Sequence, residues 1–272
     1  MRKNFAQIMH DRKIDLENEY KKLYNLLYEK RYDEIWESHS YYDILSSNFE
    51  HFWFRDTCLD LDEFNRQNGF CFEEYPVNFN IDYMISFAEY LYNLAKAHMK
   101  TSSRNKRSDA FFILSQIQNL IKLINYKEIE LGGFSVFVPI NIYSIEVSNI
   151  NSEYSYETLY YNHHSLKGNI KEKKDLLLKF ANYLEPKRKI LKTINQQLET
   201  DLFHLFNKLD IRHNNRNKED KAHYVEYLDD LSFEDLEVWY DNVYQMYLLA
   251  VLELEHFNKK KELKNFLCNL NS

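Results

Sequence analysis

Residues that break regular structure are rare in this chain, which has four glycines and three prolines among 272 residues. Glycine and proline are the residues that most often end helices and form tight turns. Their scarcity therefore favours long helices over a series of short strands and hairpins. An apolar fraction of 44% is enough to fill a sizeable core. The sequence predicts a mainly α protein.

Apolar residues recur at steps of three and four along several segments, which is the pattern of a helix that buries one face. We expect these helices over residues 12–37, 81–99, 108–125, 171–185, 186–210 and 232–257. The last two are joined by a short polar connection, so they should pair as a long C-terminal antiparallel helical hairpin. The overall prediction is a helical bundle.

Residues 128–150 are an exception to the helical pattern. Phe134, Val136 and Val138 alternate with other residues, while Gly132-Gly133 and Pro139 punctuate the run. This pattern predicts a small β-hairpin or meander near 128–150. A two-stranded element of this kind is not stable alone and must lie against helices.

These segments suggest a division of the chain into three parts. They are an N-terminal helical region at 1–126, the small β-element with its connection at 127–168, and a C-terminal helical region at 169–272. An alternative is that all three form one compact domain, because a chain of this length can be one large domain or two small ones.

Composition restricts the classes of partner and the compartment. The formal net charge of −7 provides no global basic field, so any RNA contact would use a local patch. Cys58, Cys71 and Cys268 are widely spaced and form no CxxC pair, which supports neither a disulfide framework nor a cysteine zinc site. The chain has no apolar run of about 18 residues and no signal-peptide pattern. We therefore expect a cytoplasmic protein with no membrane span, no metal and no cofactor.

The stretch RHNNRNKEDKAH, residues 212–223, lies in the connection between the last two predicted helices. Arginine binds phosphate oxygens and stays protonated. Histidine titrates near neutral pH and can transfer the protons of an RNA cleavage reaction. The 2′-hydroxyl supplies the nucleophile, so this chemistry needs no metal ion.

Arg216, Asn217 and His223 resemble the signature of the HEPN superfamily, an arginine and a polar residue followed by a histidine after four to six positions. Six residues intervene here, and the resemblance covers roughly 170–258. It implies an all-α fold and a metal-independent endoribonuclease of a toxin or phage-defence type. It also implies a homodimer acting on RNA, in which Arg216 binds the phosphate, His223 is the acid or base, and Asn217 orients them.

The sequence departs from the family pattern in one respect. The family motif usually lies at the start of the second long helix, whereas about eight residues separate His223 from Ser232. Arg212, His213 and Asn214 form a second arginine–polar group, but His223 lies ten residues beyond His213, outside the family spacing. These three are therefore second-rank candidates. A solvated loop between helices remains the alternative interpretation of the whole stretch.

Basic and aromatic clusters elsewhere have two interpretations. Lys187, Arg188 and Lys189, with Lys171, Lys173 and Lys174, could follow a nucleic-acid backbone or could form an ordinary charged helix face. The same holds for Arg104, Lys106 and Arg107 in a predicted linker. Tyr154, Tyr156, Tyr160 and Tyr161 could stack on bases or form the rim of a core. The alternative function is a non-catalytic helical protein-interaction or regulatory module, and a partner protein such as an antitoxin fits either function.

Overall fold

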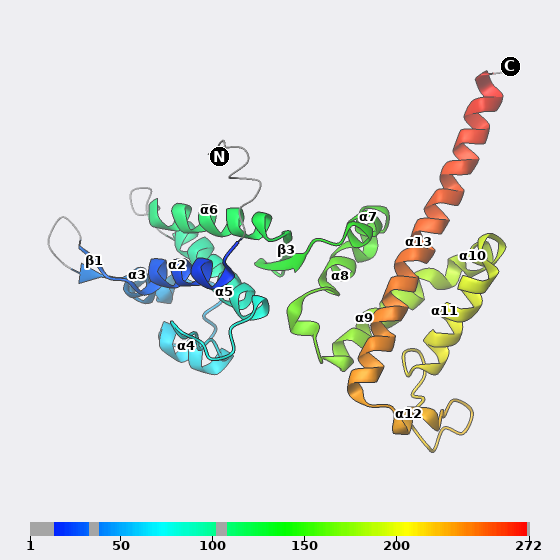
Figure 1. Cartoon of the computed structure of the whole chain (residues 1–272), viewed down its shortest axis with the longest axis horizontal. Helices are drawn as coiled ribbons and strands as arrows, with labels where there is room; N and C mark the ends of the chain where they lie inside the picture. Colours follow the sequence, from blue (N-terminus) through cyan, green and yellow to red (C-terminus); the bar gives the residue numbers. More distant parts are fainter. Residues whose placement is uncertain (1–13, 33–37, 102–107, 271–272) are drawn as a thin grey trace, which may run out of the picture. The chain divides into compact units, whose positions relative to one another are not determined.

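The structure is a computed structural model that describes residues 14–32, 38–101 and 108–270. It confirms the mainly α fold, with a small β-hairpin in the middle of the chain (Figure 1). The chain divides between Phe137 and Val138 into two compact units. The predicted basic linker residues Arg104, Lys106 and Arg107 lie outside the described residues.

The first unit is built from helices and two short hairpins. It contains, in chain order, α2 (Leu16–Tyr28), β1 (Arg31–Tyr32), β2 (Ser38–His39), α3 (Tyr41–Asn48), a 3₁₀ turn (Phe49–His51), α4 (Leu61–Asn68), α5 (Ile81–Thr101), α6 (Ser108–Leu123), β3 (Tyr126–Leu131) and all but the last two residues of β4 (Phe134–Pro139). Strands β1 and β2 pair antiparallel, with Arg31 opposite His39.

Helix α5 is the centre of the first unit. Its buried residues lie on nearly every side of the helix, which is typical of a helix surrounded by neighbours. It lies against α2, α3 and α6. The β3–β4 hairpin is fastened to the same helix, because Asn93 exchanges two hydrogen bonds of 2.8 Å with the backbone of Ser135. Gly132 and Gly133 form its two-residue turn with φ of 57° and 88°, values that favour glycine.

The second unit is a bundle. It contains, in chain order, α7 (Ile142–Ile150), a 3₁₀ turn (Ser152–Tyr154), α8 (Ser155–Tyr160), a 3₁₀ turn (His164–Leu166), α9 (Ile170–Leu184), a 3₁₀ turn (Glu185–Lys187), α10 (Arg188–Ile194), α11 (Gln196–Lys208), α12 (Tyr227–Asp230) and α13 (Phe233–Leu270).

Helix α13 organises this bundle and lies against α7, α9, α10 and α11. Helices α11 and α13 run in opposite directions, as expected for the C-terminal hairpin (Figure 1). Their apolar residues face a shared core that includes Leu202, Phe206, Val243 and Tyr247. Ser232 begins α13 as predicted, because its hydroxyl accepts the Asp235 N–H (3.0 Å).

Two helix predictions were too long. The helix expected over 12–37 ends at Tyr28, because the apolar stripe ends there and Glu29, Lys30 and Arg31 offer no face to bury. The helix expected over 186–210 is divided at Asn195, whose backbone leaves the helical conformation (φ −146°, ψ 88°). The Asn195 side chain accepts the Leu198 N–H (3.1 Å) and so starts α11 as a cap.

The β-element is shorter than predicted. Strands β3 and β4 occupy 126–139, and the remainder of the predicted segment is helix α7. The side chain of Asn141 accepts the N–H groups of Tyr143 and Ser144, which is an N-cap that begins a helix immediately after the strand. Ile142, which lies in the segment predicted as strand, is therefore the first residue of a helix.

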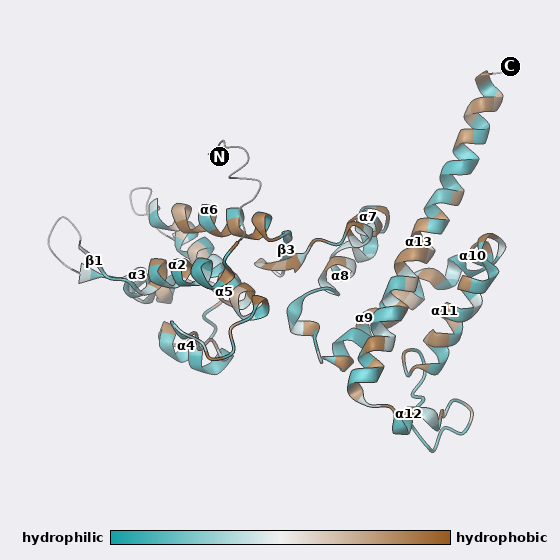
Figure 2. Ribbon diagram, viewed as in Figure 1, coloured by the Kyte–Doolittle hydropathy of each residue, from teal (hydrophilic) through white to brown (hydrophobic). Residues whose placement is uncertain are grey.

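In the described part of the chain, no helix combines the length and the apolar composition needed to cross a bilayer. Most helices carry both hydrophobic and hydrophilic residues, which are brown and teal in Figure 2.

Candidate functional site

Residues 209–226 connect α11 to α12 and contain the stretch rich in arginine and histidine. Asn215 is fully buried within this connection. Its side-chain oxygen accepts the backbone N–H of Asp210 (2.9 Å), and its side-chain nitrogen donates to the carbonyl of His223 (2.5 Å). The Asn215 carbonyl accepts the Val225 N–H (2.8 Å). One buried residue thus ties both ends of the loop together and gives its backbone a defined path.

Two histidines lie face to face on this loop. The rings of His213 and His223 are 4.1 Å apart between centroids and 22° from parallel. The Asp220 carboxylate lies 3.0 and 3.1 Å from Nδ1 of His223 and its pKa is lowered, chiefly by this hydrogen bond. A carboxylate on Nδ1 favours a proton on that nitrogen and leaves Nε2 for proton transfer. The His223 side chain is 42% exposed and is therefore accessible from solvent.

Arg216 is a cation of the loop with unfilled hydrogen-bond donors. Its guanidinium lies 5.5 Å from the ring centre of Phe233 at the start of α13. Its Nε and Nη2 atoms are buried and have no hydrogen-bond partner among the described residues. The pKa of Asp229 is lowered, first by its hydrogen bond from Lys218 and also by the Arg216 charge. Because buried N–H groups are normally satisfied, these two atoms leave the hydrogen-bonding capacity of the Arg216 guanidinium partly unused.

Arg212 is held by other groups, although its Nε is likewise buried without a hydrogen-bond partner among the described residues. It forms an ion pair with Glu185 and donates to the carbonyl of Ala181 (3.1 Å). Its guanidinium also lies over Phe203 and Phe206, at 5.3 and 5.7 Å. Arg212 therefore fastens the loop to the end of α9 and to α11. The structure does not place it with the histidine pair.

The two remaining asparagines shape the loop. The side-chain oxygen of Asn217 accepts the Glu219 N–H (3.0 Å), and the carbonyl of Asn214 accepts the Asn217 N–H (3.1 Å). Asn214 is exposed. The Asn217 side chain is thus engaged with the backbone of its own turn, which is a common use of asparagine in loops.

The predicted nucleic-acid-binding residues divide into two kinds. The Nζ atom of Lys187 lies 3.4 Å from the centre of the Tyr183 ring, and burial lowers the pKa of Lys187. Arg188 pairs with the buried Glu199 (2.5 Å). Lys189 is exposed on α10. Only Lys189 of the three presents its charge to solvent without an intramolecular ion pair or ring contact among the described residues.

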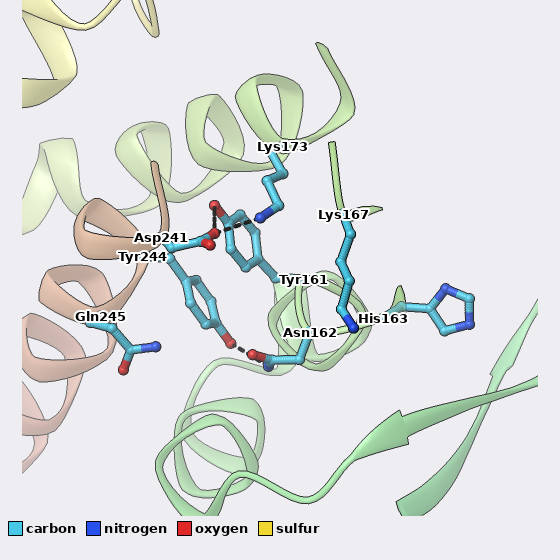
Figure 3. Close-up of a pocket in the computed structure, with 8 residues that line it drawn as sticks. All are labelled: Tyr161, Asn162, His163, Lys167, Lys173, Asp241, Tyr244 and Gln245. Atoms are coloured by element: carbon cyan, nitrogen blue, oxygen red, sulfur yellow. Dashed lines mark hydrogen bonds and ion pairs between the residues drawn. The ribbon is translucent and has the colours of Figure 1, made fainter. Parts of the chain in front are cut away.

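A second polar site is a pocket of about 220 Å³ between the segment that follows α8, helix α9 and helix α13 (Figure 3). It is lined by Tyr161, Asn162, His163, Lys167, Lys173, Asp241, Tyr244 and Gln245. Lys173 is only 5% exposed and lies 2.7 Å from Glu237 and 2.6 Å from Asp241. The Tyr161 and Tyr244 rings stack at 4.1 Å, and burial raises the pKa of Tyr161.

This arrangement changes the interpretation of two candidate residues. The positive charge of Lys173 is balanced by two carboxylates, so it serves the bundle and cannot follow a nucleic-acid backbone. Tyr161 is buried against Tyr244, so it is not a surface for base stacking. Asp241 joins them by accepting from both Tyr161 (3.1 Å) and Lys173.

Comparison with known proteins found no matching family model, no matching curated protein and no matching solved structure. The resemblance to the HEPN superfamily therefore rests on the residues of the 212–223 stretch and on their position between two helices.

Sequence reasoning missed the two residues that give the loop its geometry. Asp220 lies three positions before His223, a spacing that allows a carboxylate and an imidazole to meet in one turn. Asn215 carries no signal in the sequence, because its role depends on the backbone atoms that the fold places around it. His213 was ranked second by spacing, yet the structure places its ring directly on that of His223.

Proposed function

We propose that the α11–α13 connection is the active site of a metal-independent endoribonuclease of the toxin or phage-defence type. One observation carries this proposal: His223 has a carboxylate on Nδ1 and a second imidazole stacked on its ring. Two adjacent imidazoles and a cation with unfilled donors are the groups that cleavage through the 2′-hydroxyl requires.

Each group has a distinct task in this mechanism. His223, oriented by Asp220, takes the proton of the 2′-hydroxyl as that oxygen attacks the scissile phosphate. His213 donates a proton to the leaving 5′-oxygen. Arg216 stabilises the added negative charge on the phosphate with its guanidinium group. Asn217 maintains the turn between Arg216 and His223. The proton balance closes, because one proton is taken and one is given.

The first prediction tests the acid–base residue. His223→Ala should reduce cleavage of single-stranded RNA in EDTA by about 10²- to 10⁴-fold. The substitution keeps the backbone carbonyl that Asn215 binds, so the melting temperature should hardly change. His204→Ala, on the exposed side of α11, is the matched control and should retain full activity. Absence of EDTA-resistant cleavage by the wild type would remove the proposal.

The second prediction concerns Arg216. Arg216→Lys keeps a positive charge but cannot offer two fixed N–H groups to one phosphate. We expect it to lose most of the activity while retaining the helical content by circular dichroism. Equal activity of the lysine variant would show that only the charge matters, and equal activity of Arg216→Ala would exclude Arg216 from the reaction.

An endoribonuclease of this type should also act in cells. Expression should slow growth, and His223→Ala should relieve the effect. A neutralising partner protein would be expected beside such an enzyme. If expression is harmless and purified protein cleaves no RNA, the alternative of a non-catalytic interaction module is favoured. The exposed apolar side chains of α13, which include Leu263, Phe266 and Leu270, support that alternative.

A further inference from the structure

The last two turns of α13 carry an apolar stripe that none of the described residues covers. From Asn258 to Leu270 every residue of the helix is exposed, and in Figure 1 this end of α13 runs past its neighbours in the second unit. The stripe consists of four large apolar side chains, listed with their exposed fractions: Leu263 (56%), Phe266 (58%), Leu267 (48%) and Leu270 (65%). They occupy positions i, i+3, i+4 and i+7, which share one face of a helix. A contiguous exposed stripe of this kind indicates an interaction surface.

Positive charge accompanies the stripe. Residues 256–270 contain four lysines and a single acidic residue, whereas residues 233–255 of the same helix contain six acidic residues and no lysine or arginine. Leu267 lies seven positions after Lys260 and three after Lys264, so both lysines follow one edge of the stripe. Lys259 is paired with Glu255 (3.3 Å), while Lys260 and Lys264 have no ion pair among the described residues. A surface that matches this end of the helix is therefore apolar and negatively charged.

The short length of the stripe distinguishes a lipid surface from a partner helix. Helices that pair along a seam usually present apolar positions over about three to four heptads. This stripe spans only residues 263–270, and it does not continue towards the bundle, because Leu252 packs on the core of the second unit. His256, Lys259 and Lys260 lie between them. A bilayer requires no matching seam, since acyl chains adapt to the side chains that enter and anionic headgroups attract the lysines.

We propose that the C-terminal end of α13 binds the surface of an anionic bilayer. Residues 258–270 then lie in the plane of the headgroups, with the stripe at the boundary of the acyl chains. Lys260 and Lys264 contact the negative headgroups, with their aliphatic stems along the edge of the stripe. Asn258 and Asn265, seven positions apart, lie on the far side of the helix and stay in water. The helix lies on the bilayer and does not cross it. This proposal does not depend on the proposed nuclease activity.

The first experiment measures binding of the full chain to vesicles by co-sedimentation. The wild type should bind vesicles of phosphatidylcholine that contain about 30% phosphatidylserine more tightly than vesicles of phosphatidylcholine alone. Added salt should weaken the binding, because it screens the attraction between the lysines and the headgroups. Absence of binding to the anionic vesicles at low salt would overturn the proposal and leave an acidic partner protein as the occupant of the stripe.

Two pairs of substitutions separate the apolar and the charged contributions. Leu263→Gln with Phe266→Gln keeps the net charge and a good helix former. It should lower the partition coefficient at least about 10-fold, because less apolar surface enters the bilayer. Asn258→Gln with Asn265→Gln, on the far side of the same turns, is the matched control and should bind like the wild type. Unchanged binding of the stripe variant would overturn the proposal.

Lys260→Gln with Lys264→Gln tests the charge. Each lysine near an anionic surface contributes about 1 kcal/mol, so this pair should lower the partition coefficient for the anionic vesicles by about 30-fold. Lys192→Gln with Lys208→Gln makes the same change of net charge at exposed positions of α10 and α11 and should leave binding nearly unchanged. Equal losses in the two pairs would show that only the total charge matters, which would overturn the assignment to α13.

The second experiment determines which side of the helix meets the lipid. In a background in which the exposed Cys71 and Cys268 are serine, a dye whose emission increases in apolar surroundings is attached at Phe266→Cys or at Asn265→Cys. These two neighbouring positions lie on different sides of the helix. The anionic vesicles should increase the emission of the dye at position 266 and leave that at position 265 nearly unchanged. An equal response at both positions would contradict the proposed orientation and overturn the proposal.

Discussion

A single buried amide, that of Asn215, connects the start and the end of the α11–α13 connection. Replacing it with alanine would leave the Asp210 N–H and the His223 carbonyl buried without partners, at a cost of about 1–3 kcal/mol for each such group. We therefore expect Asn215→Ala to lower the free energy of unfolding measured in urea by about 2–3 kcal/mol. Asn214→Ala, one position earlier but exposed, should change it by less than about 0.5 kcal/mol. Equal effects of the two substitutions would contradict the anchoring role.

For individual residues, the sequence indicated which side chains carry suitable chemistry, but it did not indicate which side chains they contact. Its spacing selected Arg216 and His223, and the structure places both on one anchored loop. It could not indicate that Arg212 pairs with Glu185, because that contact depends on where α9 ends. Nor could it separate Lys173, which is buried between two carboxylates, from the exposed Lys189. The tertiary structure determines which partner a side chain has and how deeply it is buried. Neither property can be read from the residues that are adjacent in the sequence.

At the scale of elements, long apolar periodicity predicted α5, α6, α9 and the start of α13 well, because each buries a continuous face. The breaks were missed where an asparagine caps a helix, at Asn141 and Asn195. An asparagine side chain can compete with the backbone for hydrogen bonds, and its choice depends on the surroundings. On α13, Trp239 is 43% exposed although its spacing from Leu236 and Val243 fits the apolar periodicity. The buried positions include Tyr240, Tyr244 and Tyr247 instead.

These tyrosines are buried because their hydroxyls have partners. Tyr240 donates to the Leu209 carbonyl (3.1 Å), and Tyr244 donates to the Thr158 carbonyl (2.5 Å). Tyr247 accepts from Asn151 (3.0 Å). A pattern that counts tyrosine as polar or apolar by type alone cannot find such a core, since each ring is buried only together with a specific partner.

The contact between α9 and α13 should make stability depend on pH. Burial opposes the charged form of Glu237, but hydrogen bonds from Lys173 and from the Gly168 N–H hold its pKa below the ordinary value of 4.5. A carboxyl with a lowered pKa in the folded state stabilises that state above its unfolded pKa. This contribution is lost as the pH falls through the folded pKa. The free energy of unfolding should therefore decrease below about pH 4.5, and Glu237→Gln should make this decrease smaller. Glu262→Gln, at an exposed position of the same helix, is the control for general acid effects. A profile of Glu237→Gln identical to that of the wild type would contradict this assignment.

At the scale of the whole molecule, the heavy aromatic content divides into two clusters of buried side chains. One lies in the first unit and includes Phe49, Phe87 and Leu91, and the other lies in the second unit and includes Phe180 and Leu202. Composition alone allowed one large domain or two small ones, and it could not decide between them. The decision depends on which apolar faces meet, and that information lies in contacts between residues far apart in the chain.

Because each unit has its own buried core, a destabilising substitution in one unit should leave the stability of the other unit unchanged. Leu91 on α5 and Leu202 on α11 are both fully buried, so Leu91→Ala and Leu202→Ala should each cost about 2–5 kcal/mol of unfolding free energy. Hydrogen exchange followed by mass spectrometry should show faster exchange in α5 and α6 for Leu91→Ala, with α9 and α11 unchanged. Leu202→Ala should show the reverse, because the opening of each unit is governed by its own buried side chains. Ala88 on α5, which is equally buried, offers a milder control as Ala88→Gly. If both leucine variants accelerated exchange in all four helices to the same extent, the chain would unfold as one cooperative body, and the two clusters would be parts of a single core.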